Sequence, residues 1–559
     1  QTISHSLSQL LCLSVSFAAL AFATTSCYEK LNIAPPNAIT NEMVEELLKT
    51  ADDATVETIM GAIADALPPL MYGGGYNYRY SGQIDGTWSG QLAIRALSGN
   101  DVAYGYLSLP DNEYYNCGSF IDANNMAALS YWHRAFTLTN QANKMFLTLT
   151  EDVLAGSQSA KIKDYFARGL IIRAFGYLYA MENFGTNSLG MPIYTNYSVS
   201  EQDQPRKSAK ETYDSIIRWA SRADDLFAEA GVGFKATDNS SLTRGLTNYV
   251  IARAALLAAD SEGATAATYL NTAAAACDRL IEGAGGAASL MTEDQYVQKI
   301  SGNYEDNPIY PIYQASTSGF TCFAQNPEAV YGFGWQYGSG GSVVSYNNFL
   351  TGSYRIDDRL YNKIDANDYR KDNFHPNEPD HLYYLPGNTS FIDGGTPLQV
   401  GTYWSTKFAN NVGLGGGVVG NSNNAKVNTV DFAFIRLSEI YLMKAECQAR
   451  NGDANGAKAT LNILLAARSK AGTTLTCDNY SSMAGMSALE MVQLQTRIEM
   501  WGEKGLEWYN NRRWNIAVNR AGSTAHWTPG ITYPVSKMTL QIPSEELGAS
   551  PNFGPQNPM

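Results

Sequence analysis

Residues 431–472 read DFAFIRLSEIYLMKAECQARNGDANGAKATLNILLAARSKAG, and this stretch decides the fold. Apolar and small residues recur every three or four positions on both sides of Asn451-Gly452-Asp453, which places them on one face of a helix. Asn-Gly-Asp suits a tight connection between two helices. The stretch therefore predicts a helix pair of the tetratricopeptide-like kind over residues 433–450 and 455–471.

The same helical spacing recurs in five other stretches, namely residues 131–147, 161–182, 211–229, 243–260 and 267–282. Taken together, the stretches predict two arrays of helix hairpins, over 131–283 and 431–515. Hairpins that bury their apolar faces against neighbouring hairpins build a superhelix. The predicted fold class is mainly α, with a tetratricopeptide-like helix-hairpin scaffold and long loop-rich insertions that contain short strands.

Two stretches lack this periodicity. Residues 68–125 and 284–430 are rich in Gly, Asn, Tyr and Ser, and runs such as GGG and GLGGGVVG interrupt them. Loops on a rigid scaffold are where binding residues usually lie. We therefore expect a single body over 41–559, in which these two stretches form the ligand-binding part and pack against the helices.

Aromatic side chains gather in both stretches, within a chain that holds 35 Tyr, 20 Phe and 9 Trp. Tyr and Trp offer a flat apolar face with a polar edge, which suits a surface that binds ligands. The spacing of two in the runs Tyr76-to-Tyr80 and Tyr331-to-Tyr337, which include Phe333, also fits rings on a packed strand, so both interpretations stand. The predicted ligand-binding residues are Tyr76, Tyr78, Arg79, Asp85, Trp88, Tyr331, Trp335 and Tyr337.

The amino-terminal residues read as an export signal. Residues 10–23 (LLCLSVSFAALAFA) form an apolar run of signal-peptide length, and Ser26-Cys27 follows it as in a bacterial lipobox, although Thr24 stands where Leu is usual. We expect a signal peptide over 1–26, a lipid on Cys27 and an extended tether over 27–40. A plain secretory peptide cleaved nearby is the alternative.

Charge and motifs exclude several functions. The sum of 39 Lys and Arg against 53 Asp and Glu gives a net charge of −14, which disfavours nucleic acid as a partner. The sequence has no P-loop, HExxH, GxSxG, EF-hand or CxxC pattern. No helix is expected after the GxGxxG match at Gly415, and the loop with His375 and His381 reads as solvated rather than as a metal site. No cofactor and no metal are expected.

Three glutamates, Glu499, Glu503 and Glu507, recur at helical spacing within 497–514. Paired carboxylates can act as the acid and base of a glycosidase. On a helix rich in Arg, salt bridges within the helix are the favoured interpretation, and the expected partners are Arg497, Lys504 and Arg512. By the same argument, salt bridges within helices are predicted for three other residues, Arg436, Glu439 and Glu446. We expect a role in holding helices together for Arg512, Arg513 and Trp514.

Several of these segments resemble one family in order and spacing. They are residues 167–194, 431–472 and 497–514, together with Ile542-Pro543-Ser544-Glu545-Glu546 and Gln556-Asn557-Pro558. With the lipobox, they resemble the SusD/RagB family of Bacteroidetes outer-membrane lipoproteins. Thr496, Lys504 and Asn510 depart from the family pattern at scaffold positions.

The resemblance implies a nutrient-binding protein, not an enzyme, that is lipid-anchored on the outer surface of the outer membrane. Its partner would be a SusC-like TonB-dependent transporter, to which it would deliver an oligosaccharide. Trp88 and Trp335 would stack on sugar faces, and Arg79 and Asp85 would hydrogen-bond the hydroxyls. A peptide ligand as in the RagB branch, a secreted glycoside hydrolase and a pure protein-interaction scaffold are the alternatives.

Overall fold

The computed structural model describes most of the chain from residue 41 onward. The described residues are 41–71, 88–104, 122–196, 203–297 without 237 and 239, 300–301, 314–315, 319–320, 323–333, 354–376, 403–405, 407–408, 431–526 and 530–559. The expected signal peptide, Cys27 and the tether lie outside them.

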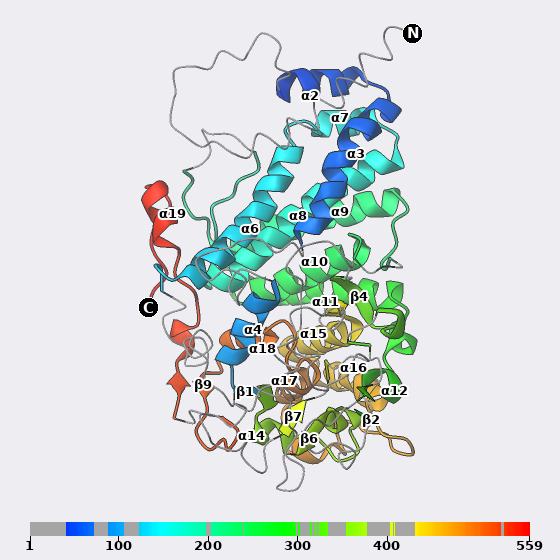
Figure 1. Ribbon diagram of the computed structural model, residues 1–559, viewed down its shortest axis with the longest axis vertical. Helices are drawn as coiled ribbons and strands as arrows, with labels where there is room; N and C mark the ends of the chain where they lie inside the picture. Colours follow the sequence, from blue (N-terminus) through cyan, green and yellow to red (C-terminus); the bar gives the residue numbers. More distant parts are fainter. Residues whose placement is uncertain are drawn as a thin grey trace.

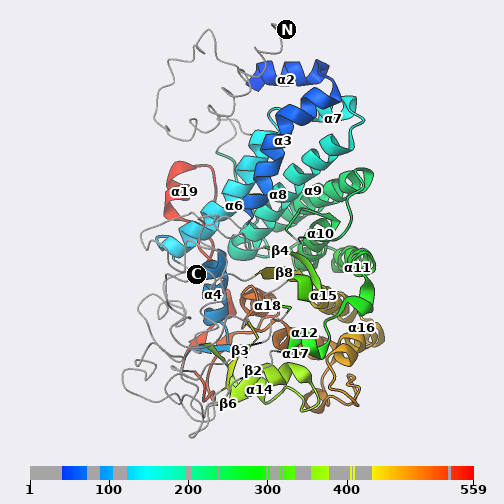
Figure 2. The same cartoon turned by 45° about the vertical axis from the view of Figure 1, so that its right-hand side comes forward.

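Eight helices form the scaffold: α6 (Met126–Met145), α8 (Ala160–Phe184), α9 (Ala209–Glu229), α10 (Arg244–Ala258), α11 (Ala266–Gly283), α15 (Leu437–Arg450), α16 (Ala454–Ala467) and α17 (Ala488–Glu499). Helix α6 packs on α8, and each helix from α8 to α11 packs on the next. Helix α11 then packs on α15, although the central insertion separates them in sequence. The two predicted arrays are thus one scaffold along the long axis of the molecule (Figures 1 and 2), and the predicted mainly α fold is confirmed.

The remaining helices lie around this scaffold. They are α2 (Asn41–Thr50), α3 (Asp53–Leu70), α4 (Trp88–Ser98), α7 (Glu151–Gly156), α12 (Glu293–Tyr296), α14 (Asp358–Tyr361), α18 (Leu506–Arg513) and α19 (Ser544–Ala549). Short 3-10 turns occupy Gly286–Ser289, Phe323–Gln325, Tyr369–Asn373, Ser481–Met483 and Val535–Lys537. Among the described helices, none combines the length and the apolar character that a membrane crossing requires.

Local sequence explains where the scaffold helices begin and how closely they pack. A capping box opens α9, because the Ser208 side chain accepts from the Glu211 backbone while the Glu211 side chain accepts from Ser208. Asp453 caps α16, and Gly452 takes the positive φ of 86° that the tight turn before it needs. A side chain at Gly176 would place its Cβ 2.7 Å from the Ala135 carbonyl oxygen, so glycine lets α8 approach α6.

Two helix predictions need correction. Residues 433–436, expected to begin a helix, belong instead to strand β8 (Phe432–Arg436), which pairs with β4 (Ala329–Phe333). Residues 497–514, expected to be one helix, are divided between α17 and α18. Lys504 and Gly505 between them have φ values of 55° and 60°, and this left-handed backbone cannot continue an α-helix.

The described strands are short and antiparallel. A four-stranded sheet has the order β1 (Val102–Tyr104), β5 (Tyr354–Ile356), β7 (Tyr403–Ser405), β6 (Phe374–Pro376). Two-stranded pairs are formed by β4 with β8, β2 (Ile300–Ser301) with β3 (Gln314–Ala315), and β9 (Val518–Asn519) with β10 (Thr532–Tyr533). The four-stranded sheet therefore joins the early stretch 68–125 to the central insertion.

Candidate ligand-binding region

Most of the predicted ligand-binding residues lie outside the described residues. These are Tyr76, Tyr78, Arg79, Asp85, Trp335 and Tyr337, and their binding roles stay predictions. Trp88 is the first residue of helix α4, directly after the early aromatic run. Tyr331 lies in the middle of strand β4. The structure therefore describes the helix and the strand, α4 and β4, that border the two aromatic stretches.

Tyr331, one of the predicted ligand-binding residues, is fully buried. Its ring meets Phe333 edge-on at a centroid distance of 5.6 Å and Phe434 at 6.5 Å. Phe333 is also buried and packs on Phe434 at 5.7 Å. The beginning of this run thus has the geometry of a packed strand, which was the second interpretation of its spacing.

Strand pairing brings the two insertions to one place. In the β1–β5 register, Tyr104 is paired with Tyr354, and Val102 with Ile356. Tyr104 is the last described residue before 105–121, and Tyr354 is the first after 334–353, the stretch that holds Trp335 and Tyr337. The early stretch and the central insertion are therefore attached at neighbouring points of one sheet. Sequence reasoning did not find this pairing, because three-residue strands carry little periodicity.

The described part also contains a set of eight buried charged side chains, which we call the buried charge network. Its members are Glu328, Asp368, Arg370, Lys407, Arg436, Arg468, Glu499 and Glu503, all at most 2% exposed. Their four positive and four negative charges balance. The network connects the residue before β4, the end of β8, the residue after α16, the end of α17 with the connection that follows it, the turn before β6 and the segment after β7.

Arg436 lies at the centre of the network. Its guanidinium contacts Glu328 at 2.7 Å, Glu499 at 3.0 Å and Glu503 at 2.7 Å. Arg468 reaches Glu328 and Glu499 at 2.5 and 2.9 Å. Buried ions are tolerated only when they are paired and hydrogen-bonded in this way.

The remaining pairs extend the network to the insertion. Arg370 contacts Asp368 at 2.6 Å and Glu499 at 3.0 Å. Lys407 contacts Glu503 at 2.7 Å and also donates to the backbone carbonyls of Glu499 and Trp501. The network therefore fixes both the turn before β6 and the residue after β7.

Electrostatics keep the network charged. Burial alone would raise the pKa of Glu499, but Arg468, Arg436 and Arg370 hold this pKa well below its usual range. Burial lowers the pKa of Lys407 to about 8, against the opposing effect of Glu503. Glu499 is thus an ionised structural carboxylate.

These contacts correct the predicted salt bridges. Glu499 and Glu503 pair with cations of distant segments, and the Glu507 carboxylate accepts from the backbone N–H groups of Asn100 and Asp101. The prediction failed because the chain breaks between α17 and α18, so that Glu499 and Glu503 share Arg436 of β8 while Glu507 binds backbone N–H groups before β1. Their occupied oxygens also leave them unsuited to act as a glycosidase acid–base pair.

Two further ion pairs connect helix α15 to α18 and to the residues just before it. Glu439 binds Lys504 at 2.5 Å, which corrects its predicted pairing within the helix, whereas Glu446 binds Arg513 of α18 and also pairs within α15 with Arg450 at 3.6 Å, as predicted. Trp514 donates its indole N–H to the same Glu446 at 3.1 Å. The predicted packing role of Arg513 and Trp514 is confirmed. Cys447, the residue after Glu446 in the same helix, is also buried.

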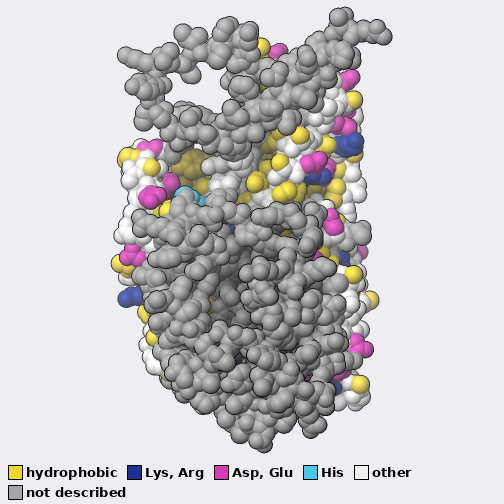
Figure 3. Space-filling view, in the orientation of Figure 1, with side chains coloured by type: hydrophobic (Ala, Val, Ile, Leu, Met, Phe, Trp, Pro, Cys, Tyr) yellow, Lys and Arg dark blue, Asp and Glu magenta, His cyan; other side chains and the backbone are white. Residues whose placement is uncertain are grey.

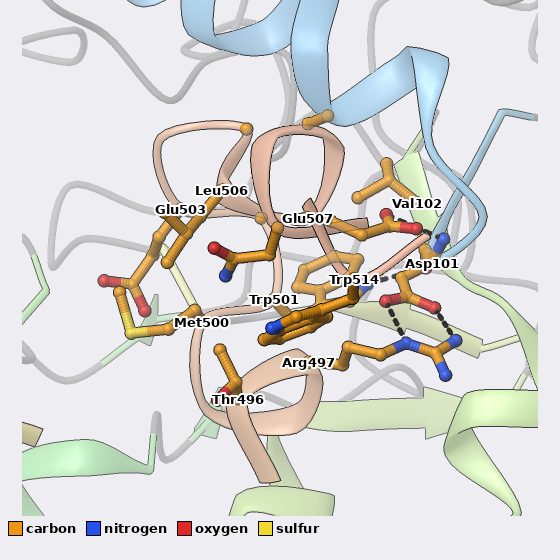
Figure 4. Close-up of a pocket in the computed structure, with 14 residues that line it drawn as sticks. Asp101, Val102, Thr496, Arg497, Met500, Trp501, Glu503, Leu506, Glu507 and Trp514 are labelled. Atoms are coloured by element: carbon orange, nitrogen blue, oxygen red, sulfur yellow. Dashed lines mark hydrogen bonds and ion pairs between the residues drawn. The ribbon is translucent and has the colours of Figure 1, made fainter. Parts of the chain in front are cut away.

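Two hollows inside the described part are too small for an oligosaccharide. The first lies between the α4–β1 turn and the α17–α18 connection, where Trp501, Glu507 and Trp514 line it (Figure 4), and it holds about 10 Å³ of free space. The second, beside Lys504 and Tyr249, holds about 30 Å³. Such volumes fit one or two water molecules, whereas ligand pockets span about 300–1,000 Å³. Both hollows are internal packing features.

The outer surface of the described part is chemically mixed. Figure 3 shows acidic, basic and apolar side chains interspersed over the described part of one face, with no continuous basic area there. Across the described residues, no group of three His, Cys, Asp or Glu side chains is arranged to hold a metal ion.

Solved structures with this architecture define the class as the SusD-like fold. A SusD-like carbohydrate binding protein from Bacteroides vulgatus matches with a TM-score of 0.64 and 19% identity, over 90% of this chain and 97% of its own. Surface glycan-binding protein A from Bacteroides thetaiotaomicron matches at 0.60 and 15%, over 90% and 99%. A laminarin binding SusD-like protein matches at 0.57 and 17%, over 91% and 99%.

The sequence itself carries the family assignment. Residues 287–551 match the model of the SusD family. No curated protein sequence matches the chain. This match and the SusD-like fold confirm the resemblance to the SusD/RagB family that the sequence motifs carried.

Proposed function

We propose that this protein is a cell-surface lipoprotein that binds a glycan and delivers it to a SusC-like TonB-dependent transporter of the outer membrane. The family match and the fold support this function, and so do the names of two solved neighbours, a surface glycan-binding protein and a laminarin binding protein. The lipobox-like Ser26-Cys27 supports a lipid anchor.

The observation that carries the proposal is the pairing of β1 with β5. It places β1, which follows helix α4 and its first residue Trp88, next to β5, which directly follows the stretch that holds Trp335. Sugars present C–H faces that stack on aromatic rings and hydroxyls that need donors and acceptors. In the proposed site Trp88 and Trp335 stack on sugar rings, while Arg79 and Asp85 bind hydroxyls.

The first experiment asks which class of ligand binds. The purified protein is applied to an array of plant, algal, fungal and host oligosaccharides and, in parallel, to an array of short peptides. The proposal expects concentration-dependent binding to a related group of glycans and none to peptides. Binding to peptides alone would replace the glycan with the ligand class of the RagB branch.

A second assay separates binding from catalysis. The glycan that binds best is incubated with the protein at high concentration, and new reducing ends are measured over a day. The proposal expects no release above a protein-free control. Release that grows with protein concentration would revive the glycoside hydrolase alternative.

A further inference from the structure

The tripeptide Gly99-Asn100-Asp101, between α4 and β1, is held by residues that follow it by several hundred positions in the chain. The N–H groups of Asn100 and Asp101 donate to the two oxygens of Glu507 at 2.5 and 3.0 Å. The Gly99 carbonyl accepts from Arg520 at 3.0 Å. We call this tripeptide the latch.

The other polar groups of the latch are bound as well. The Asn100 carbonyl lies 2.9 Å from Nε2 of His526, and the Asp101 carbonyl accepts from the Trp501 indole at 2.8 Å and from the Asp357 backbone at 3.0 Å. The Asp101 carboxylate forms two hydrogen bonds with Arg497, at 2.5 and 2.9 Å. Such complete satisfaction by tertiary contacts fixes the latch in one conformation.

Glu507 binds two consecutive backbone N–H groups of the latch. Besides the two backbone bonds, its Oε1 accepts from Asn511 at 2.9 Å. A Cβ on Gly99 would lie 2.2 Å from its Oε2, so the carboxylate occupies the space that glycine leaves open. The titratable groups that face it are Asp101 and Arg497, and Figure 4 shows it beside that ion pair.

The latch directly precedes strand β1. Val102, the next residue, is paired with Ile356 of β5, and Asp357 at the end of β5 donates its backbone N–H to the Asp101 carbonyl. His526 also contacts the Asp357 carboxylate at 3.1 Å, so the same shell of side chains holds the ends of both strands. At its opposite end β5 directly follows 334–353, the stretch that holds Trp335 and Tyr337, whereas on the early side the latch directly follows helix α4, whose first residue is Trp88.

We propose that Glu507 is a positioning residue for ligand binding: through the latch, helix α18 holds β1 and the end of α4, which begins at Trp88, beside β5, which directly follows the stretch that holds Trp335. This inference rests on the proposed function, but its first readout needs no ligand. Glu507 does not touch the ligand in this account.

The test compares Glu507→Ala, Glu507→Gln and Gly99→Ala with the matched control Glu446→Ala. Glu446 also clamps α18, through Arg513 and Trp514, but it has no contact with the latch. Amide hydrogen exchange is followed by mass spectrometry in peptides that cover 97–104 and 354–360. Glu507→Ala and Gly99→Ala should accelerate exchange there by about tenfold or more, because each removes the bonds to the latch.

Glu507→Gln should fall between wild type and Glu507→Ala, since its remaining carbonyl can still accept from Asn100. Glu446→Ala should leave exchange in these peptides within about twofold of wild type. Unchanged exchange in both Glu507→Ala and Gly99→Ala, or equal acceleration in the control, would overturn the latch. If Glu507→Ala does not fold, Gly99→Ala and Glu507→Gln decide the question alone.

The positioning role is tested by measuring the affinity of each variant for the glycan that binds best on the array. Glu507→Ala and Gly99→Ala should weaken it about tenfold while the folded Glu446→Ala retains it. Faster exchange with unchanged affinity would make the latch purely structural and overturn the positioning role. If the wild-type protein binds no glycan on the array, the proposed function fails. The hydrogen-exchange results then test the latch by themselves.

Discussion

Arg436 shows how one buried side chain connects segments that are distant in the sequence. It is fully buried at the end of β8 and contacts three carboxylates: Glu328 directly before β4, Glu499 at the end of α17 and Glu503 in the α17–α18 connection. A buried ion network contributes little net stability compared with an apolar core, but removing one member leaves uncompensated charge. Arg436 is therefore expected to be among the most sensitive scaffold positions.

Arg436→Met should lower the free energy of unfolding by about 3–5 kcal/mol, because Glu499 and Glu503 lose their shared cation in a dry environment. Chemical denaturation followed by circular dichroism measures the change. Arg218→Met, at an exposed arginine of α9, is the control and should stay within about 0.5 kcal/mol of wild type. An Arg436→Met protein as stable as this control would contradict the role of the network.

His526 gives stability a defined pH dependence. Burial lowers the pKa of His526, outweighing the opposite effect of its hydrogen bond to Asp357, and burial also lowers the pKa of His133. As pH falls through about 6.5, the unfolded chain takes up protons that the folded chain resists, so stability declines toward acid pH. His526→Gln should flatten the decline between pH 7 and 5, by at most about 1.4 kcal/mol per pH unit.

Thermal unfolding of wild type and His526→Gln across that range provides the comparison. His133→Gln should flatten the curve in the same direction, and the double variant should flatten it further. Parallel curves for wild type and His526→Gln would show that His526 does not resist protonation in the folded state.

At the scale of helices and strands, the sequence predicted those elements that are specified by residues close together in the chain. Helices α15 and α16 follow from apolar spacing and from the Asn-Gly-Asp turn, all within one short stretch. Strand β8 was mistaken for the start of a helix because its partner β4 lies far away in the sequence, and the strand forms only through that pairing. Lys407 was missed for the same reason, since nothing near it in sequence indicates that it meets Glu503.

The QNP motif drew attention to the carboxy-terminal segment, and the structure shows what this segment contacts. Asn557, in the QNP motif, is buried, donates to the carbonyls of Phe184 and Leu540 at 2.8 and 2.7 Å, and accepts from Arg206 at 2.9 Å. The segment thereby binds the end of α8.

Asn557→Ala should destabilise the protein by about 1–3 kcal/mol, because buried polar groups lose their partners. The exposed Asn552, which binds Asp203 at 2.8 Å, is the matched control, and Asn552→Ala should cost under about 1 kcal/mol. Equal unfolding midpoints for the two variants in a urea titration would argue against a structural role for the motif.

At the scale of the whole molecule, the scaffold is continuous from α6 to α17, and the sheet β1–β5–β7–β6 connects the early stretch to the central insertion. This arrangement agrees with a single body over 41–559, which stays a proposal. Sequence reasoning predicted the class of this body and the two stretches expected to bind ligand. It did not predict how they join, because that depends on three-residue strands and on buried charges distant in sequence.

The proposed anchor determines where the molecule works. A lipidated Cys27 supplies several acyl chains, whereas one chain alone binds membranes only marginally. In cells, Cys27→Ala should move the protein from the membrane fraction to soluble fractions, and labelled palmitate should no longer be incorporated. Cys322→Ala provides a control for loss of a thiol elsewhere. Unchanged palmitate incorporation by Cys27→Ala would refute lipidation at this residue.

Glycan capture by the two aromatic stretches is the central claim, and isothermal titration calorimetry tests it most directly. The best-binding array glycan is titrated into wild type, Trp88→Ala and Trp335→Ala, each checked for folding by circular dichroism. Removing an indole that buries about 100–200 Å² at about 25 cal/mol/Å² should weaken a micromolar ligand until its heat is nearly undetectable. Wild-type affinity in both folded variants would contradict the claim.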